Sequence, residues 1–368
     1  CRSWTGHSPW RSGSSGGVPE LATLGWDDAW NAAFEKHRAE GLVPGRVSVQ
    51  HRGAWDVLTE DGEIRARLPG RVRRDAGSSA ELPVVGDWVA LEPPSGREPG
   101  AIRDVLPRRT KFSRLAAHDP GSDVTREQVV AANVDIVFLV ASLVDDLSPR
   151  RFERYLTLTW ESGARPVILL TKADLEPDPD PAVASVKAIA GEGVPVHAVS
   201  VRTGSGLDDV RAHLGPGVTS ALLGPSGVGK STLVNALAGE DVMSTAAVRD
   251  DGSGRHTTTH RQLVILPGGG LVVDNPGMRE LHLWLAADGL EEAFEDVMEL
   301  EARCKFSDCR HEGEPGCAIE EALAHGSPDP ERWRSYLDLR QELAELDERL
   351  ERRERSRARR RRPDAGTS

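Results

Sequence analysis

Eight consecutive residues, from Gly224 to Ser231, have the spacing of a loop that binds phosphates. Their sequence, GPSGVGKS, matches G-x-x-x-x-G-K-[ST] and lies between the apolar run ALL and the helical stretch STLVNALAG. Glycines let successive backbone N–H groups turn inward onto phosphates, and the N-terminus of the following helix adds partial positive charge. We expect Lys230 to bridge the outer phosphates and Ser231 to hold Mg²⁺. The residues predicted to surround the phosphates are Gly224, Pro225, Ser226, Gly227, Val228, Gly229, Lys230, Ser231 and Thr232.

A second motif, TKAD, follows the apolar strand RPVILL and points to the base that is bound. An aspartate at that strand end can accept hydrogen bonds from both N1–H and the exocyclic N2–H of guanine, a pairing that adenine cannot offer. On its own, the string TKAD is more typical of a solvated helix cap than of a nucleotide site. Beside a phosphate loop, it favours guanine binding. A serine in HAVSVRTGSG, at the next strand end, would supply the loop that closes over the base. The predicted base-binding residues are Thr171, Lys172, Ala173, Asp174, Ser200 and Val201.

Hydrolysis requires two further parts, a switch threonine on Mg²⁺ and a D-x-x-G turn after a strand. The segment GRHTTTH supplies the threonines at 257–259, of which we assign Thr258 to Mg²⁺ and to catalysis. The segment LVVDNPG supplies Asp274 and Gly277. These two segments predict a pair of nucleotide-sensitive switches.

The position that follows the D-x-x-G turn is Met278, where many GTPases carry a glutamine that orients the attacking water. An apolar side chain cannot align water, so we expect slow intrinsic turnover. His256, beside the switch threonines, is the candidate for orienting the water. The alternative for His256 is a purely structural role.

A cysteine-rich segment, CKFSDCRHEGEPGC, has the spacing of a metal site. Three cysteines are an odd number for disulfides, and four soft ligands with no open position suit tetrahedral structural Zn²⁺. The alternative, unrelated buried thiols, fits poorly with the polar string EGEPG. The predicted zinc ligands are Cys304, Cys309, His311 and Cys317.

The elements that must position these residues fall into three stretches. Aromatic residues spaced by four predict a helix in residues 25–41. Residues 44–112 read as five short strands with turns, among them the run IRARLPGRVRR and a hairpin turn at Asp61-Gly62, which is the pattern of an OB-type barrel. From residue 133, short apolar strands alternate with helices, which predicts a mostly parallel sheet covered on both faces. Past residue 285 the pattern is helical apart from the cysteine loop.

The order of the nucleotide motifs is unusual, because TKAD precedes the phosphate loop. All the expected strands and helices are present, so the sheet can be the usual one with its ends rejoined near residues 215–217 and reopened elsewhere. The sequence therefore predicts a circularly permuted GTPase domain, whose second switch leads directly into the cysteine region.

The chain has 368 residues and a net charge of −12, with 38% hydrophobic residues, which suits two or three domains. Its longest apolar stretch is too short to cross a bilayer, and residues 1–17 lack the apolar core of a signal peptide, so we expect a cytoplasmic protein with no membrane partner. Residues 351–362 carry eight arginines against two glutamates, so this basic end could contact a polyanion despite the acidic body. A merely solvated end is the alternative.

With these motifs in this order, the sequence resembles the ribosome small subunit-dependent GTPase A family, also called RsgA, YjeQ or EngC, over roughly residues 25–350. The resemblance implies an OB domain, a permuted G domain and a zinc domain. It also implies binding to the 30S subunit late in maturation, stimulation of GTP hydrolysis by that subunit, and a catalytic role for His256. Three features depart from the family pattern: Asn275 replaces the usual threonine, TKAD stands where NKxD is also common, and residues 1–24 have no clear counterpart.

We therefore expect a multi-domain monomer that binds GTP with Mg²⁺, carries one structural Zn²⁺ and engages 16S rRNA on the 30S subunit. Two alternatives remain: an RNA-binding nucleotide switch with little hydrolysis, and a P-loop small-molecule kinase. The predicted divisions are a low-complexity start at 1–24, the helix and barrel at 25–115, the G domain at 125–283, the helical zinc domain at 284–350 and a basic tail at 351–368.

Overall fold

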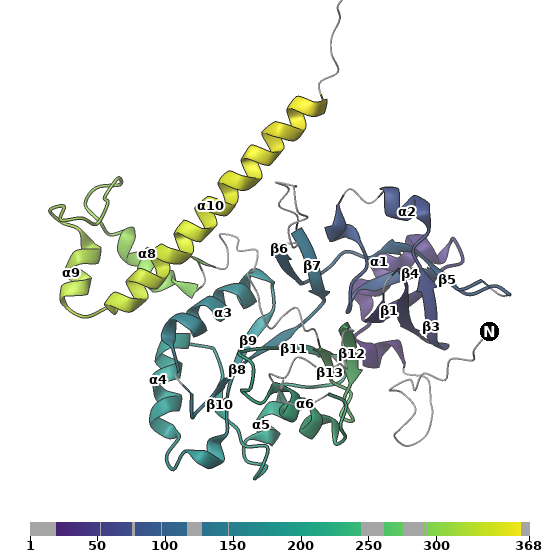
Figure 1. The fold of residues 1–368 in the computed structure, drawn as a ribbon, viewed down its shortest axis with the longest axis horizontal. Helices are drawn as coiled ribbons and strands as arrows, with labels where there is room; N and C mark the ends of the chain where they lie inside the picture. The colour runs from purple at the N-terminus through teal and green to yellow at the C-terminus, as the bar shows by residue number, and fades with distance from the viewer. Residues whose placement is uncertain are drawn as a thin grey trace, which may run out of the picture.

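The computed structural model describes residues 20–51, 53–75, 78–96, 98–115, 127–145, 147–243, 261–274, 290–291 and 293–361. Three regions follow one another along the chain: a small barrel, a central sheet flanked by helices, and a helical part that ends in one long helix (Figure 1). This arrangement confirms the predicted multi-domain fold class.

A short helical segment precedes the barrel and packs against its outside. It consists of the 3₁₀ helix η2 (Leu21–Leu24) and the helix α1 (Asp28–Arg38). Asp27 caps α1, because its carboxylate accepts a hydrogen bond of 3.0 Å from the backbone N–H of Trp30. The ring of Trp26 meets Trp88 of the barrel edge-on at 4.7 Å. The observed helix is shorter than the predicted 25–41, so Trp26 contacts Trp88 from the turn before α1, while Trp30 of α1 lies 6.3 Å from the same ring.

The barrel has the strand topology of an OB fold. Its strands run in the order β1-β2-β3-β5-β4, and β4 pairs back with β1 to close the ring. Strands β2 and β3 form a hairpin as predicted, but its two-residue turn is at Glu60 and Asp61, one position before the expected Asp61-Gly62, because Thr59 pairs with Gly62. The five strands are β1 (Val43–Gln50), β2 (Trp55–Thr59), β3 (Gly62–Arg67), β4 (Trp88–Glu92) and β5 (Gly100–Val105).

One segment of the barrel differs from the prediction. The run IRARLPGRVRR was expected to be a single strand, but β3 ends at Arg67 and a helix, α2 (Gly70–Asp75), follows. Pro69 cannot donate to a strand ladder, and its carbonyl instead accepts a hydrogen bond of 3.0 Å from the N–H of Arg73. A second short helix, η3 (Ser79–Glu81), precedes β4.

Two strands that the sequence did not predict lie between the barrel and the central sheet. Strands β6 (Lys111–Leu115) and β7 (Glu127–Ala132) pair in antiparallel fashion as a separate two-stranded sheet. The backbone comes very close to the barrel here, since a Cβ atom on Gly86 would lie 2.1 Å from the carbonyl oxygen of Ala132. Only glycine permits this approach, at a φ of 91°.

The central sheet has the strand order β10-β9-β8-β11-β13-β12, in which every pair except β13–β12 is parallel. Helices α3 and α4 pack on one face, and α5 and α6 pack on the opposite face. The strands are β8 (Ile136–Ser142), β9 (Arg165–Thr171), β10 (Val196–Ala198), β11 (Thr219–Leu223), β12 (Arg261–Ile265) and β13 (Leu271–Asp274). The helices are α3 (Pro149–Glu161), α4 (Asp180–Ala190), α5 (Leu207–Ala212) and α6 (Lys230–Ala238), with the 3₁₀ helix η4 (Ala173–Leu175) after β9.

Strand β11, which leads into the phosphate loop, is fourth of these six along the chain but lies in the middle of the sheet, between β8 and β13. This placement is the one expected for a permuted G domain. At its far edge, β12 pairs with β1 of the barrel, with Val49 opposite Gln262 and Gln50 opposite Arg261. The barrel and the central sheet are therefore joined by backbone hydrogen bonds.

The C-terminal region has its own core and is tied to α3 of the central part. It contains α8 (Glu295–Glu301), α9 (Ala318–Ala324) and α10 (Pro330–Arg361), the long helix in Figure 1. Tyr336, Leu339 and Leu343 of α10 are buried in this core.

Three ion pairs link α3 and α10, of which Arg332–Glu153 at 3.1 Å is the most buried. Within the described ranges, no helix is both long enough and apolar enough to cross a bilayer.

Candidate nucleotide site and metal centre

The predicted phosphate loop connects β11 to α6 at the carboxyl edge of the parallel sheet. Gly224 lies beneath it with a φ of 151°, and a Cβ atom there would lie 2.1 Å from the carbonyl oxygen of Val140. Gly227 and Gly229 also have positive φ, which turns the backbone as an anion-binding loop requires. Ser231 and Thr232 lie in the first turn of α6, where the helix dipole favours negative charge.

The ammonium group of Lys230 is held within the loop. Its Nζ atom donates to the carbonyl oxygen of Gly224 at 2.7 Å and to that of Pro225, and the residue is 8% exposed. A cation fixed at this point would attract phosphate, and the contact of Lys230 with the outer phosphates stays a prediction.

Thr171 connects the guanine motif to the phosphate loop. Its hydroxyl is buried and lies 3.0 Å from the carbonyl oxygen of Ala141 and 2.5 Å from that of Val228. The sequence placed Thr171 among the residues that surround the nucleotide, whereas its hydroxyl contacts the loop from behind. This contact fixes the end of β9 relative to the loop that follows β11.

Asp174 and Ser200 come together as predicted. The hydroxyl of Ser200 donates to Asp174 at 2.6 Å, and this bond holds the pKa of the carboxyl below its usual range. Arg202 lies 3.4 Å from the other carboxylate oxygen, a contact that the sequence analysis missed. Lys172 adopts a φ of 59°, unusual for a residue other than glycine. An ionised carboxylate at this strand end can accept two hydrogen bonds from guanine.

Asp274 ends β13 and borders the same small cavity as Lys230. Asp274 is buried, with 8% of its surface exposed. The other predicted switch residues, which are His256, Thr257, Thr258, Thr259, Asn275, Gly277 and Met278, lie outside the described residues.

The four predicted metal ligands converge. The donor atoms of Cys304, Cys309, His311 and Cys317 all lie within 4.8 Å of one another. Burial and the neighbouring thiols raise the pKa of the Cys309 thiol to about 11, so a bound cation is what would make a thiolate favourable there. Three sulfurs and one nitrogen in a closed cluster fit tetrahedral Zn²⁺.

The histidine of this cluster is oriented by a carboxylate that the sequence analysis did not single out. Its Nδ1 atom faces the sulfurs of Cys304 and Cys317, and its Nε2 atom lies 3.3 Å from Glu301. Glu301 in turn accepts hydrogen bonds from Tyr336 at 2.7 Å and Arg340 at 2.8 Å, both on α10. Such a carboxylate fixes the tautomer and the direction of a metal-binding imidazole.

These features define a class of protein. A P-loop fold in permuted strand order, with an aspartate positioned for guanine, an OB barrel ahead of it and a Cys₃His cluster behind it, describes a circularly permuted GTPase.

Comparisons with known proteins identify the family. The family model described as RsgA GTPase matches residues 105–284. The "Small ribosomal subunit biogenesis GTPase RsgA" of Streptomyces coelicolor is 46% identical over 325 residues, which cover 88% of this chain and 86% of the relative. The protein of the same name from Opitutus terrae is 45% identical over 334 residues, covering 88% and 90%.

Two solved structures are also similar. The crystal structure of YjeQ from Thermotoga maritima matches with a TM-score of 0.60 and 29% identity, covering 82% of this chain and 99% of that one. YloQ, described as a circularly permuted GTPase, matches with a TM-score of 0.57 and 25% identity, covering 83% and 96%. The chain belongs to the RsgA GTPase family, which confirms the resemblance and the predicted class of GTP hydrolase.

Proposed function

We propose that this GTPase acts on the small ribosomal subunit during its late maturation, and that the subunit stimulates hydrolysis of GTP to GDP and phosphate. The observation that carries the proposal is the contact of Thr171 with Val228, because it sets the guanine-recognising strand end against the phosphate loop as one unit. The names of the relatives, which refer to small ribosomal subunit biogenesis, support the partner.

Different residues of the site bind the base and the phosphates of GTP. Asp174, held by Ser200, accepts the two N–H groups of guanine, while the stem of Lys172 covers the base. The backbone N–H groups of residues 224–232 surround the phosphates, and Lys230 neutralises the charge of the outer ones.

Hydrolysis takes place at the γ-phosphate end of the same edge. A Mg²⁺ ion bound with GTP would neutralise charge on the β- and γ-phosphates, held by Ser231 and Thr258. His256 would orient the attacking water, since Met278 cannot. Asp274 and Gly277 form the second switch, which leads into the helical region.

The cysteine cluster has a structural role in this proposal. Zn²⁺ bound to it would cross-link the loop between α8 and α9 and add no chemistry of its own. The GTP-bound protein would then contact 16S rRNA through the barrel, the zinc-binding region and the basic end at 351–368. A cytoplasmic monomer without a membrane partner fits this role.

The kinase alternative gives no reason for the aspartate in TKAD, and the switch alternative predicts binding without turnover. The test is phosphate release from GTP and from ATP by the purified protein, alone and with 30S or 50S subunits. We expect GTP-specific release that 30S subunits alone accelerate. Comparable rates with ATP would favour a kinase, and no acceleration by either subunit would favour a switch without useful hydrolysis.

A further inference from the structure

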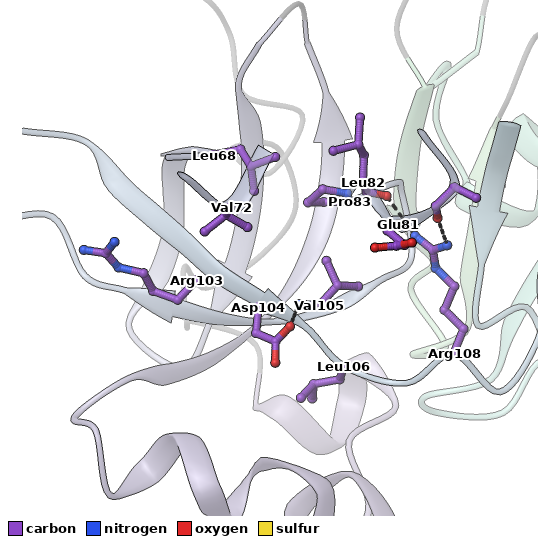
Figure 2. A pocket seen from close by; sticks show the side chains of 11 residues that line it. Leu68, Val72, Glu81, Leu82, Pro83, Arg103, Asp104, Val105, Leu106 and Arg108 are labelled. Carbon is purple, nitrogen blue, oxygen red and sulfur yellow. Dashed lines mark hydrogen bonds between the residues drawn. The ribbon is translucent and has the colours of Figure 1, made fainter. Parts of the chain in front are cut away.

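A cavity of about 510 Å³ opens at the end of the barrel where β3 and β5 terminate. Leu68 and Val72 face it from the β3–α2 segment, and Pro83 and Val105 line its other sides (Figure 2). Arg103 and Arg108 lie at opposite ends of the space. Its volume is in the range of pockets that take small organic groups.

The wall formed by residues 80–83 is fixed by hydrogen bonds. Arg108 donates to the carbonyl oxygens of Ala80 and Leu82, at 2.5 and 2.8 Å, and forms a 2.7 Å ion pair with Asp87, which is fully buried. The indole N–H of Trp55 donates to the carbonyl oxygen of Pro83 at 2.9 Å. Because these contacts come from the barrel itself, the cavity is preformed.

The segment from β3 to α2 beside the cavity is rich in arginine, while the carboxylates of Glu81 and Asp104 also line the cavity. Residues 55–64 contain four acidic residues and no lysine or arginine, whereas residues 65–74 contain five arginines and no acidic residue. The latter run includes the end of β3 and most of α2. Arg67 and Arg73 are exposed and have no ion-pair partner within the part of the chain that the structure describes. In a chain of net charge −12, this run is a local excess of positive charge, which would attract a polyanion.

The surface that OB folds commonly use for nucleic acids is less suitable in this chain. That surface is formed by strands 2 and 3. Here β2 and the start of β3 carry Asp56 and Glu63. The Asp56 side chain is 13% exposed and pairs with Arg65 at 3.1 Å, whereas Glu63 is exposed. Trp55 is buried inside the barrel. Asp56 and Arg65 neutralise each other, and the exposed Glu63 would repel phosphates, so this face offers less unpaired positive charge than the end that holds the cavity.

We propose that this cavity binds an unpaired nucleotide of an RNA strand, with Arg67 and Arg73 on the flanking phosphates. The base would lie between Val72 and Pro83, since unstacked bases in RNA are taken up by apolar surfaces and arginine planes. The inference rests on the proposed function, because it takes RNA of the small subunit as the partner.

The test uses the full chain and a short single-stranded RNA of mixed sequence that contains 4-thiouridine. Removal of two phosphate contacts in Arg67→Ala/Arg73→Ala should weaken binding and reduce the slope of log affinity against log salt by about 1.4. Filling the cavity with Val72→Trp should weaken binding about tenfold without changing that slope. The control is Arg211→Ala/Arg303→Ala, which removes the same charge from exposed sites outside the barrel. This variant should leave the RNA affinity and the salt slope unchanged.

Cross-linking of the wild-type protein provides a readout that needs no variant. Photoactivated 4-thiouridine should attach to peptides from residues 65–83. Cross-links confined to residues 55–63 or to other regions would overturn the proposal. It would also be overturned if the Val72→Trp variant bound RNA as tightly as the wild type does. The same conclusion would follow if an acidic peptide displaced the RNA while the cavity itself stayed unaffected.

Phosphate release with 30S subunits separates this inference from the proposed function. Suppose that 30S subunits stimulate GTP hydrolysis and that substitution of Arg67, Arg73 and Val72 leaves RNA binding unchanged. That result would refute the proposed role of the cavity and leave the proposed function in place. Absence of stimulation in the wild type would refute the function, whatever the cross-links show.

Discussion

The nucleotide edge and the cysteine cluster are held together in different ways. The phosphate loop follows a strand of a paired sheet, and the hydroxyl of Thr171 in β9 contacts both Ala141 of β8 and Val228 of the loop. Around the cysteine cluster, residues 305–316 include no helix or strand, and nearly all of them are partly or fully exposed. A site built on a sheet can exist before its ligand arrives, whereas a loop with so little packing depends on the ligand to close it.

The largest expected effect follows from removing a metal ligand. Cys309→Ser should lose Zn²⁺, because three ligands cannot complete a tetrahedral structural site. Residues 300–325 should then become sensitive to trypsin, while the barrel and central sheet stay resistant. Zinc content by atomic absorption and proteolytic mapping check this. A zinc-free variant that keeps the wild-type pattern of fragments would remove the distinction between the two sites.

Removing the loop cation should affect chemistry and leave folding intact. Lys230→Ala is expected to lower kcat for GTP by about 10²–10³-fold, because a fixed charge at the transferred phosphate is lost. Thermal unfolding should stay close to that of the wild type, since the glycines and the sheet shape the loop. A lower rate accompanied by loss of the folded sheet would show that Lys230 supports the loop as well as the reaction.

Changing the carboxylate at the end of β9 should change the preferred base. Asp174→Asn is expected to weaken GTP binding by about 100-fold, because two charge-assisted hydrogen bonds are lost. The new amide can donate to the C2 oxygen of xanthine, so xanthosine triphosphate should bind better to the variant than GTP does. Arg202→Ala is the control, since this exposed side chain only touches the carboxylate at 3.4 Å. Equal loss in both variants would point to a general disturbance of the loop.

The smallest expected effect concerns the support of the zinc ligand. Glu301→Ala should weaken Zn²⁺ binding by about 10–100-fold, because His311 loses the group that orients it. Tyr336→Phe removes one contact to the same carboxylate and should have a weaker effect. Competition with a chromophoric chelator measures both affinities. Wild-type affinity in Glu301→Ala would show that the loop alone orients the imidazole.

The functional residues were easier to predict from the sequence than the elements and side chains that hold them in place. GPSGVGKS, TKAD and the cysteine spacing depend on local residues, and the structure brings each set together. The strands β6 and β7 and the helix α2 were not predicted. In α2, Pro69 ends the strand, and in β6 and β7 the pairing joins residues 12 to 21 positions apart, which no local pattern shows. Glu301 was missed for the same reason, since only folding places it beside His311.

The most direct test of the contrast is a titration of GDP into the zinc-loaded protein and into the same protein stripped of zinc by a chelator. The sheet fixes the nucleotide edge independently of the cysteine loop, so we predict dissociation constants that agree within about twofold, equivalent to about 0.4 kcal/mol. A loss of affinity beyond tenfold on removal of zinc would contradict this account, because it would make the nucleotide site dependent on the metal.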